Sequence, residues 1–227
     1  MNRWKFFVLL ACASLAAQLS AQKLLPVSVA VSTNYQLNGV AVSQDDRVFV
    51  ALPRWVQPDS FSLGEVKDGK VVPYPGGDWN TWHPGLDEES RFTTVNAVWV
   101  EPGIPNALWV VDCGQGIAHG KKLVKIDLKT NTVSRVYHFS QEDAPLAACL
   151  NDVRIAKGHA FLTESGTGAI LTVDLKTGRV RRVLAASRKT KAVPGRTAVV
   201  DGRKLAGPDG KPPLVHADDI EIGRAHV

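Results

Sequence analysis

Four Asn or Asp side chains recur at the starts of alternating apolar runs, at intervals of between 55 and 67 residues. They are Asn38 in LNGVAV (37–42), Asn96 in VNAVWV (95–100), Asn151 in LNDVRI (150–155) and Asp218 in ADDIEI (217–222). Amide and carboxylate oxygens at such positions either bind a ligand or bond the backbone amides of a nearby turn. The choice depends on whether the folded chain brings the four side chains together.

The elements around these residues also repeat. The first three copies are each followed by a second strand pattern, at 47–53, 107–114 and 160–166, and then by a hairpin pattern, at 66–74, 124–137 and 171–184. Asp68-Gly69, Asn131 and Gly178 are available for the positive-φ positions of the three hairpin turns. A repeat of about 45–60 residues that holds four short strands is typical of a β-propeller blade. We therefore predict an all-β fold, a β-propeller, with about three blades and the first strand of a fourth.

The propeller geometry predicts where the polar side chains meet. The first strand of each blade lines the central channel and the second strand returns to the same rim, and channel mouths are the usual ligand sites of such folds. The candidate ligand-binding residues at this rim are Asn38, Asn96, Asn151, Asp218, Arg54 and His216. The carboxylates that could act as general acid or base there are Asp152, Glu164 and Asp219. The alternative for Asp152 and Asp219 is that their side chains point into the interface between blades and bond the backbone there.

Two cysteines lie on neighbouring blades at the same rim. Cys113 follows the second strand of one unit, and Cys149 precedes the first strand of the next. We expect a disulfide that joins the two blades, and two buried free thiols are the alternative. Trp55, Trp79 and Trp82 lie in a Pro-rich loop region, where they either pack the loop or form an aromatic platform at the mouth.

The N-terminus has the pattern of a secretory signal peptide. Arg3 and Lys5 precede a short apolar run, and small residues end it, which predicts cleavage after Ala21. The chain of 227 residues is 44% hydrophobic and carries a net charge of +5, of which export would remove two positive charges. We expect a secreted or periplasmic protein with a small-molecule ligand, no nucleic-acid partner and no membrane span.

Several strings of the sequence resemble the major royal jelly protein and yellow family. They are GVAVSQDDRVFVALPRW (39–55), the Pro-Tyr-Pro before a Trp-rich turn (73–82), LWVVDCG (108–114) and LNDVRI with FLTESGTGAILTVDLKTGRVRRVL (150–184). The resemblance runs from about 31 to 222. It implies a secreted six-bladed propeller of roughly twice this length, whose relatives include dopachrome-tautomerase-like proteins and ligand-binding proteins without established catalysis. An isomerase acting on a catechol-like or indole-like ligand is one function that it implies.

A more distant resemblance is to the gluconolactonase and senescence-marker propellers. Those enzymes hold a divalent cation, usually Ca²⁺, with a Glu, an Asn and an Asp that begin inner strands, and Asn151 and Asp218 match the Asn and Asp positions. The first-blade position holds Asn38 in place of the Glu, which removes an anionic ligand from a hard-cation site. A calcium-dependent lactone hydrolase is therefore the alternative function, and a purely structural role is a third.

The C-terminal residues bear on the length of the domain. Propellers close with typically four to eight blades. The string IGRAHV (222–227) back-translates onto the start of a common sequencing adapter, so we interpret 22–222 as the N-terminal part of a propeller domain and 223–227 as read-through of the adapter. A dimer of half-propellers is the competing interpretation.

Overall fold

The computed structural model describes residues 29–55, 57–104, 106–114, 116–207 and 209–223. The predicted signal peptide (1–21) lies outside these residues, and so does most of the predicted adapter read-through, 224–227. Within the described part of the chain, no helix has the length and apolar character needed to cross a membrane.

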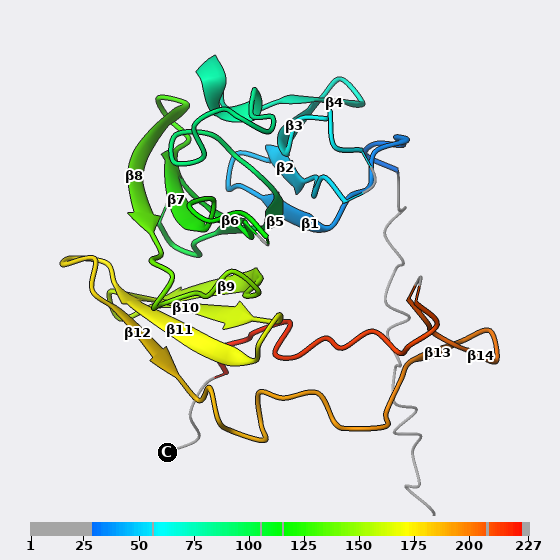
Figure 1. Ribbon diagram of the computed structural model, residues 1–227. Coiled ribbons are helices and arrows are strands. Elements are labelled where there is room, and N and C mark those ends of the chain that lie inside the picture. Colours follow the sequence, from blue (N-terminus) through cyan, green and yellow to red (C-terminus); the bar gives the residue numbers. More distant parts are fainter. Residues whose placement is uncertain (1–28, 56, 105, 115, 208, 224–227) are drawn as a thin grey trace, which may run out of the picture.

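The structure is built from consecutive four-stranded antiparallel sheets, as predicted from the repeat (Figure 1). The first sheet contains β1 (Gly39–Val42), β2 (Val48–Ala51), β3 (Leu63–Lys67) and β4 (Lys70–Pro73). The second contains β5 (Val95–Val100), β6 (Ala107–Asp112), β7 (Lys122–Asp127) and β8 (Thr132–His138). The third contains β9 (Leu150–Ala156), β10 (His159–Glu164), β11 (Ala169–Asp174) and β12 (Val180–Val183). A short 3₁₀ helix, η1 (Gly77–Asn80), lies between the first two sheets in the chain.

The hairpin turns take the backbone conformation that the sequence predicted. Asp68 and Gly69 have φ of 50° and 71° between β3 and β4, Asn131 has φ of 55° between β7 and β8, and Gly178 has φ of 78° before β12. Residues with positive φ match the right-handed twist of the flanking strands. Each sheet is thus a meander in which strand order follows chain order.

The sheets pack face to face through two apolar clusters. Phe49 and Leu63 of the first sheet, with Tyr74 just after β4, pack with Leu108 and Ile126 of the second. The second cluster places Trp109, Val111, Leu123 and Tyr137 of the second sheet against Leu150, Val153, Leu162 and Leu171 of the third. The inner strands β1, β5 and β9 contact one another in turn. This is the arrangement of propeller blades, and the all-β propeller prediction is confirmed for the described residues.

The segment beyond β12 does not form the predicted first strand of a fourth blade at 217–222. A short hairpin of β13 (Val199–Val200) and β14 (Arg203–Lys204) follows the third sheet, and the chain then returns beside that sheet (Figure 1). Residues 217–222 form no strand; the Ala217 and Ile220 N–H groups donate to the Thr190 carbonyl (3.0 Å) and to Asp152 Oδ2 (3.2 Å). An inner propeller strand obtains its ladder from the second strand of its own blade, and here these two N–H groups bond to groups of the preceding unit instead.

Candidate functional site

The four recurring Asn and Asp residues line one cavity. Asn38 directly precedes β1, Asn96 and Asn151 lie in β5 and β9, and Asp218 lies in the segment that returns beside the third sheet. The cavity has a volume of about 550 Å³ and is also lined by Trp55, Cys149, Ser165, Gly166, Leu214, Val215 and Asp219. The propeller geometry therefore brings these four side chains, up to 180 residues apart in the chain, to a single opening.

The side-chain amides link consecutive units. Asn38 Nδ2 donates to the Asn96 carbonyl at 2.9 Å, and Asn96 Nδ2 donates to the Leu150 carbonyl at 3.3 Å. Asn151 Nδ2 donates to Ser165 Oγ at 3.3 Å and also to Asp218 Oδ1. The side-chain amide nitrogens of these asparagines therefore link neighbouring units. The sequence had suggested either ligand binding or hydrogen bonds to a nearby turn, and this role is a third one.

The oxygen of one amide is left without a donor. The Asn96 side chain is 1% exposed, and its Oδ1 has no hydrogen-bond partner among the described residues. The Asn96 amide nitrogen donates to the Leu150 carbonyl, so it is the amide oxygen that lacks a partner. A buried acceptor without a donor costs free energy, and it would gain a bond from any ligand N–H or O–H that reached it.

The carboxylates at the cavity make it attractive to cations. Burial and the neighbouring Asp219 and Asp152 carboxylates raise the pKa of Asp218, and the hydrogen bond from Asn151 offsets this only in part. The negative charge at the mouth is therefore incompletely compensated by the protein. A proton or a cationic group of a ligand would relieve the repulsion.

Two of the three candidate catalytic carboxylates, Asp152 and Glu164, are hydrogen-bonded to other groups of the protein. Asp152 accepts bonds from Arg154 Nη1 (3.0 Å) and from the Ile220 N–H, and so it holds residues 217–222 to β9. Glu164 is fully buried and accepts bonds from the N–H groups of Cys149, Gly166 and Thr167 and from Arg182 Nη2. Of the three candidates, Asp219 is the one that lines the cavity.

Glu164 remains charged because of its bonds. Burial acts to raise its pKa, but the Thr167 and Arg182 side chains and the backbone N–H groups outweigh burial and lower the pKa below its usual value. A carboxylate with so many donors is a poor base for activating water.

Arg54 and His216 lie outside the set of lining residues. Arg54 is buried, donates to the Trp82 and Asn80 carbonyls, and lies over the Trp82 ring at 5.6 Å. Burial lowers its pKa. His216 Nδ1 accepts a bond from the Ala192 N–H at 2.9 Å. Both side chains hold loops beside the mouth.

Trp55 is the lining residue whose role the sequence left open. It is 51% exposed and faces the cavity, whereas Trp79 packs on Phe92 at 4.9 Å and Trp82 packs under Arg54. The sequence feature that could have placed Trp55 at the cavity is its position next to Arg54, just after the second strand of the first unit. Ser165, Leu214 and Val215 were not singled out, because their positions carry no repeat.

The two cysteines are joined. Cys113 directly follows β6 and Cys149 directly precedes β9, with 5.0 Å between their Cα atoms. The disulfide links the second and third sheets beside the cavity, which Cys149 also lines.

The arrangement does not fit a calcium ion. Calcium takes roughly six to eight oxygen ligands. Here Asn151 presents its N–H group, not its oxygen, to Asp218. Within the described ranges, no group of three or more His, Cys, Asp or Glu side chains is placed to hold a metal ion.

No family model matches the sequence, and no curated protein matches it. Many solved structures resemble the fold, and three of them illustrate the likeness. A protein of unknown function from Bacteroides caccae has 13% identity and a TM-score of 0.45, over 67% of this chain and 47% of its own. The extracellular domain of BT4673 from B. thetaiotaomicron has 10% identity and a TM-score of 0.47, over 82% of this chain and 25% of its own.

Virginiamycin B lyase from Staphylococcus aureus has 14% identity and a TM-score of 0.42, over 79% of this chain and 48% of its own. The chain thus spans half or less of the length of each of these structures. At these values the likeness carries no argument about function, and the propeller assignment rests on the three sheets and their packing.

Proposed function

We propose that this protein is a secreted or periplasmic propeller that binds a small aromatic amine, of catechol-like or indole-like type, at the channel mouth. The observation that carries the proposal is a cavity lined by Asn96, Asp218 and Asp219, because the Oδ1 of Asn96 has no hydrogen-bond donor among the described residues. A ligand that supplies hydroxyl and ammonium donors satisfies both the oxygen and the carboxylates.

Trp55 supports the aromatic part of the ligand. Its exposed indole faces the cavity together with Leu214 and Val215, so an aromatic ring could stack there while its polar groups reach the acceptors. Aromatic faces also attract ammonium groups within about 6 Å. The same cavity gives an anionic ligand no lining Lys or Arg.

If the bound ligand is isomerised, Asp219 is the group in position to move a proton. It lines the cavity, whereas Asp152 and Glu164 are bonded elsewhere. Burial, and then charge repulsion from Asp219, raise the pKa of the neighbouring Asp218.

Calorimetric titration with dopamine and with catechol tests the proposal. We expect dopamine to bind at least about tenfold more tightly, since only dopamine carries the ammonium group, and Asp218→Asn and Trp55→Ala each to weaken it by about tenfold or more. Because Asp218 binds its proton more tightly than usual, affinity should fall as pH is lowered toward its raised pKa. Glu142→Gln, which alters an exposed carboxylate away from the cavity, serves as the matched control.

Equal binding of dopamine and catechol, or variants without effect, would remove the basis of the proposal. Hydrolysis of a lactone that requires added calcium would support the hydrolase in its place. Decay of dopachrome absorbance that is lost in Asp219→Asn would extend the proposal from binding to catalysis.

A further inference from the structure

The longest connection between units carries a concentration of positive charge. Residues 184–217 lead from the third sheet to the segment that returns beside it, whereas 74–94 and 139–149 connect the other sheets. Connections longer than about 15 residues are uncommon in compact domains and are usually either functional or linkers. We call residues 187–205 of this connection the basic arm.

The basic arm accounts for the net charge of the chain. It contains six basic residues and one acidic residue, a net charge of +5 (6 − 1), and the whole chain has the same net charge of +5. The basic residues are Arg188, Lys189, Lys191, Arg196, Arg203 and Lys204, the acidic one is Asp201, and all seven are exposed. The remaining residues balance to zero, so the excess positive charge of the molecule resides in the arm.

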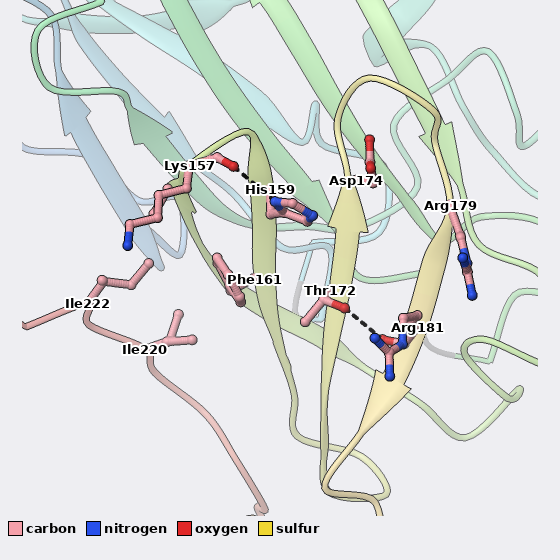
Figure 2. Close-up of a pocket in the computed structure, with 10 residues that line it drawn as sticks. Lys157, His159, Phe161, Thr172, Asp174, Arg179, Arg181, Ile220 and Ile222 are labelled. Atoms are coloured by element: carbon pink, nitrogen blue, oxygen red, sulfur yellow. Dashed lines mark hydrogen bonds between the residues drawn. The ribbon is translucent and has the colours of Figure 1, made fainter.

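These positive charges are not neutralised by nearby carboxylates. Among the described residues, none of the six basic side chains of the arm takes part in an ion pair. Lys191 Nζ donates to the Thr167 carbonyl, which carries no net charge. The third sheet differs, because Figure 2 shows Asp174 in the same pocket as the basic side chains Lys157, Arg179 and Arg181.

The tip of the arm combines basic with exposed aliphatic side chains. Val199 of β13 lies directly opposite Lys204 of β14, and Val200 lies opposite Arg203. Since residues directly opposite share a face, each face of this hairpin carries one valine and one basic residue. Val199 and Val200 are 60% and 56% exposed, and Leu205 at the end of the arm is 46% exposed.

The hairpin projects from the body of the molecule. Figure 1 shows β13 and β14 away from the three four-stranded sheets. Within the described part of the chain, the hydrogen bonds of 197–205 stay inside this segment. The Leu205 N–H donates to the Ala198 carbonyl at 2.8 Å, and Thr197 Oγ1 donates to the Leu205 carbonyl at 3.0 Å. The valines and the basic residues are thus presented together to whatever the arm meets.

We propose that the basic arm binds the surface of an anionic membrane. The basic side chains lie among the lipid phosphates, and the hairpin valines enter the boundary between headgroups and acyl chains. Segments that lie in a membrane interface combine basic and apolar side chains in this way. A soluble polyanion would engage the basic residues but would give the exposed valines no role. This proposal is independent of the amine site at the channel mouth.

Cosedimentation of the full chain with lipid vesicles tests the proposal. We expect binding to vesicles of equal parts phosphatidylcholine and phosphatidylglycerol at least about tenfold tighter than to phosphatidylcholine alone, and weaker as salt is added. Arg203→Gln/Lys204→Gln should weaken binding to the anionic vesicles by at least about tenfold, since each basic residue near such a surface contributes about fivefold. Val199→Ser/Val200→Ser should weaken it by at least about fivefold, because the variant loses apolar groups that the interface would bury.

The matched control is Lys129→Gln/Lys176→Gln. It removes the same charge from exposed positions in the turns after β7 and β11, outside the arm, and should change binding by less than about twofold. Dopamine affinity and thermal melting equal to those of wild type would show that the hairpin variants keep their fold.

Several results would overturn the proposal. One is equal binding to neutral and anionic vesicles. Another is a control pair that weakens binding as much as the hairpin pair does, since any loss of surface charge would then suffice. Unchanged vesicle binding by the valine variant, together with equally tight binding to dextran sulfate, would assign the arm to a soluble polyanion instead of a membrane.

Discussion

At the scale of single residues, two buried carboxylates fix the corners of the second and third sheets. Asp112 and Glu164 each end a second strand, where they pair with Val95 and Leu150 of the inner strands. Asp112 accepts bonds from the Thr93 and Thr94 N–H groups and pairs with Lys122 at 2.8 Å. Buried charges are tolerated when their acceptor positions are filled in this way. Topology placed Glu164 near the rim, but only the structure shows that its carboxylate turns into its own corner.

The variant Glu164→Gln measures the contribution of this corner. The amide would set an NH₂ group against several donors and leave Arg182 without its charge partner, so we expect a loss of about 2–4 kcal/mol in the free energy of unfolding at pH 7. Because the folded pKa is lowered from 4.5, the stabilisation is complete above that value and is lost as pH falls through the folded pKa.

Urea unfolding of both proteins at pH 7 and near pH 3 checks this expectation. The difference in the free energy of unfolding between wild type and Glu164→Gln should be smaller at the lower pH. Glu142→Gln, at an exposed position, is the control and should change little. A gap that stays constant with pH would contradict the assigned role of the charge.

At the scale of elements, the asparagines at the inner strands hold one unit to the next. Their positions at the strand starts were predictable, because the alternation of apolar residues fixes the strand and the repeat fixes the register. Their partners were not predictable. The bond from Asn38 to the Asn96 carbonyl depends on the angle between two sheets, which no local pattern in the sequence encodes.

The pair Asn96→Ala and Asn38→Ala tests this linkage. Both substitutions remove an amide that donates to the next unit, but Asn96 is buried and Asn38 is exposed. We expect Asn96→Ala to cost about 1–2 kcal/mol and Asn38→Ala less than about 1 kcal/mol, because removing a buried partner leaves the Leu150 carbonyl unpaired. Chemical denaturation of the two variants side by side gives the comparison. Equal losses would show that the bonds between units do not depend on burial.

At the scale of the whole molecule, the sequence predicted the meander of each sheet and the order of the units. The period-2 alternation and the positive-φ turn residues are local signals, and both were confirmed at Asp68-Gly69, Asn131 and Gly178. Residues 217–222 carry the same local signal as an inner strand and yet form none, because a strand also needs a partner along its edge. The N–H groups of Ala217 and Ile220 instead donate to the Thr190 carbonyl and to Asp152, so the local pattern alone does not specify a strand.

The disulfide between Cys113 and Cys149 acts at this largest scale, because it adds a covalent link to two sheets that otherwise hold together by packing and hydrogen bonds. It closes a loop of 36 residues, and the chain-entropy model gives about 4 kcal/mol for a loop of that length. We expect the double variant Cys113→Ala/Cys149→Ala to unfold at lower denaturant concentration by a corresponding amount. Wild type unfolded in the presence of a reductant should match the variant, since both lose the same constraint on the unfolded chain. If oxidised and reduced wild type unfold together, the disulfide contributes nothing to stability, and packing around Leu150 and Trp109, together with hydrogen bonds such as that from Asn96 to the Leu150 carbonyl, holds the second and third sheets in place.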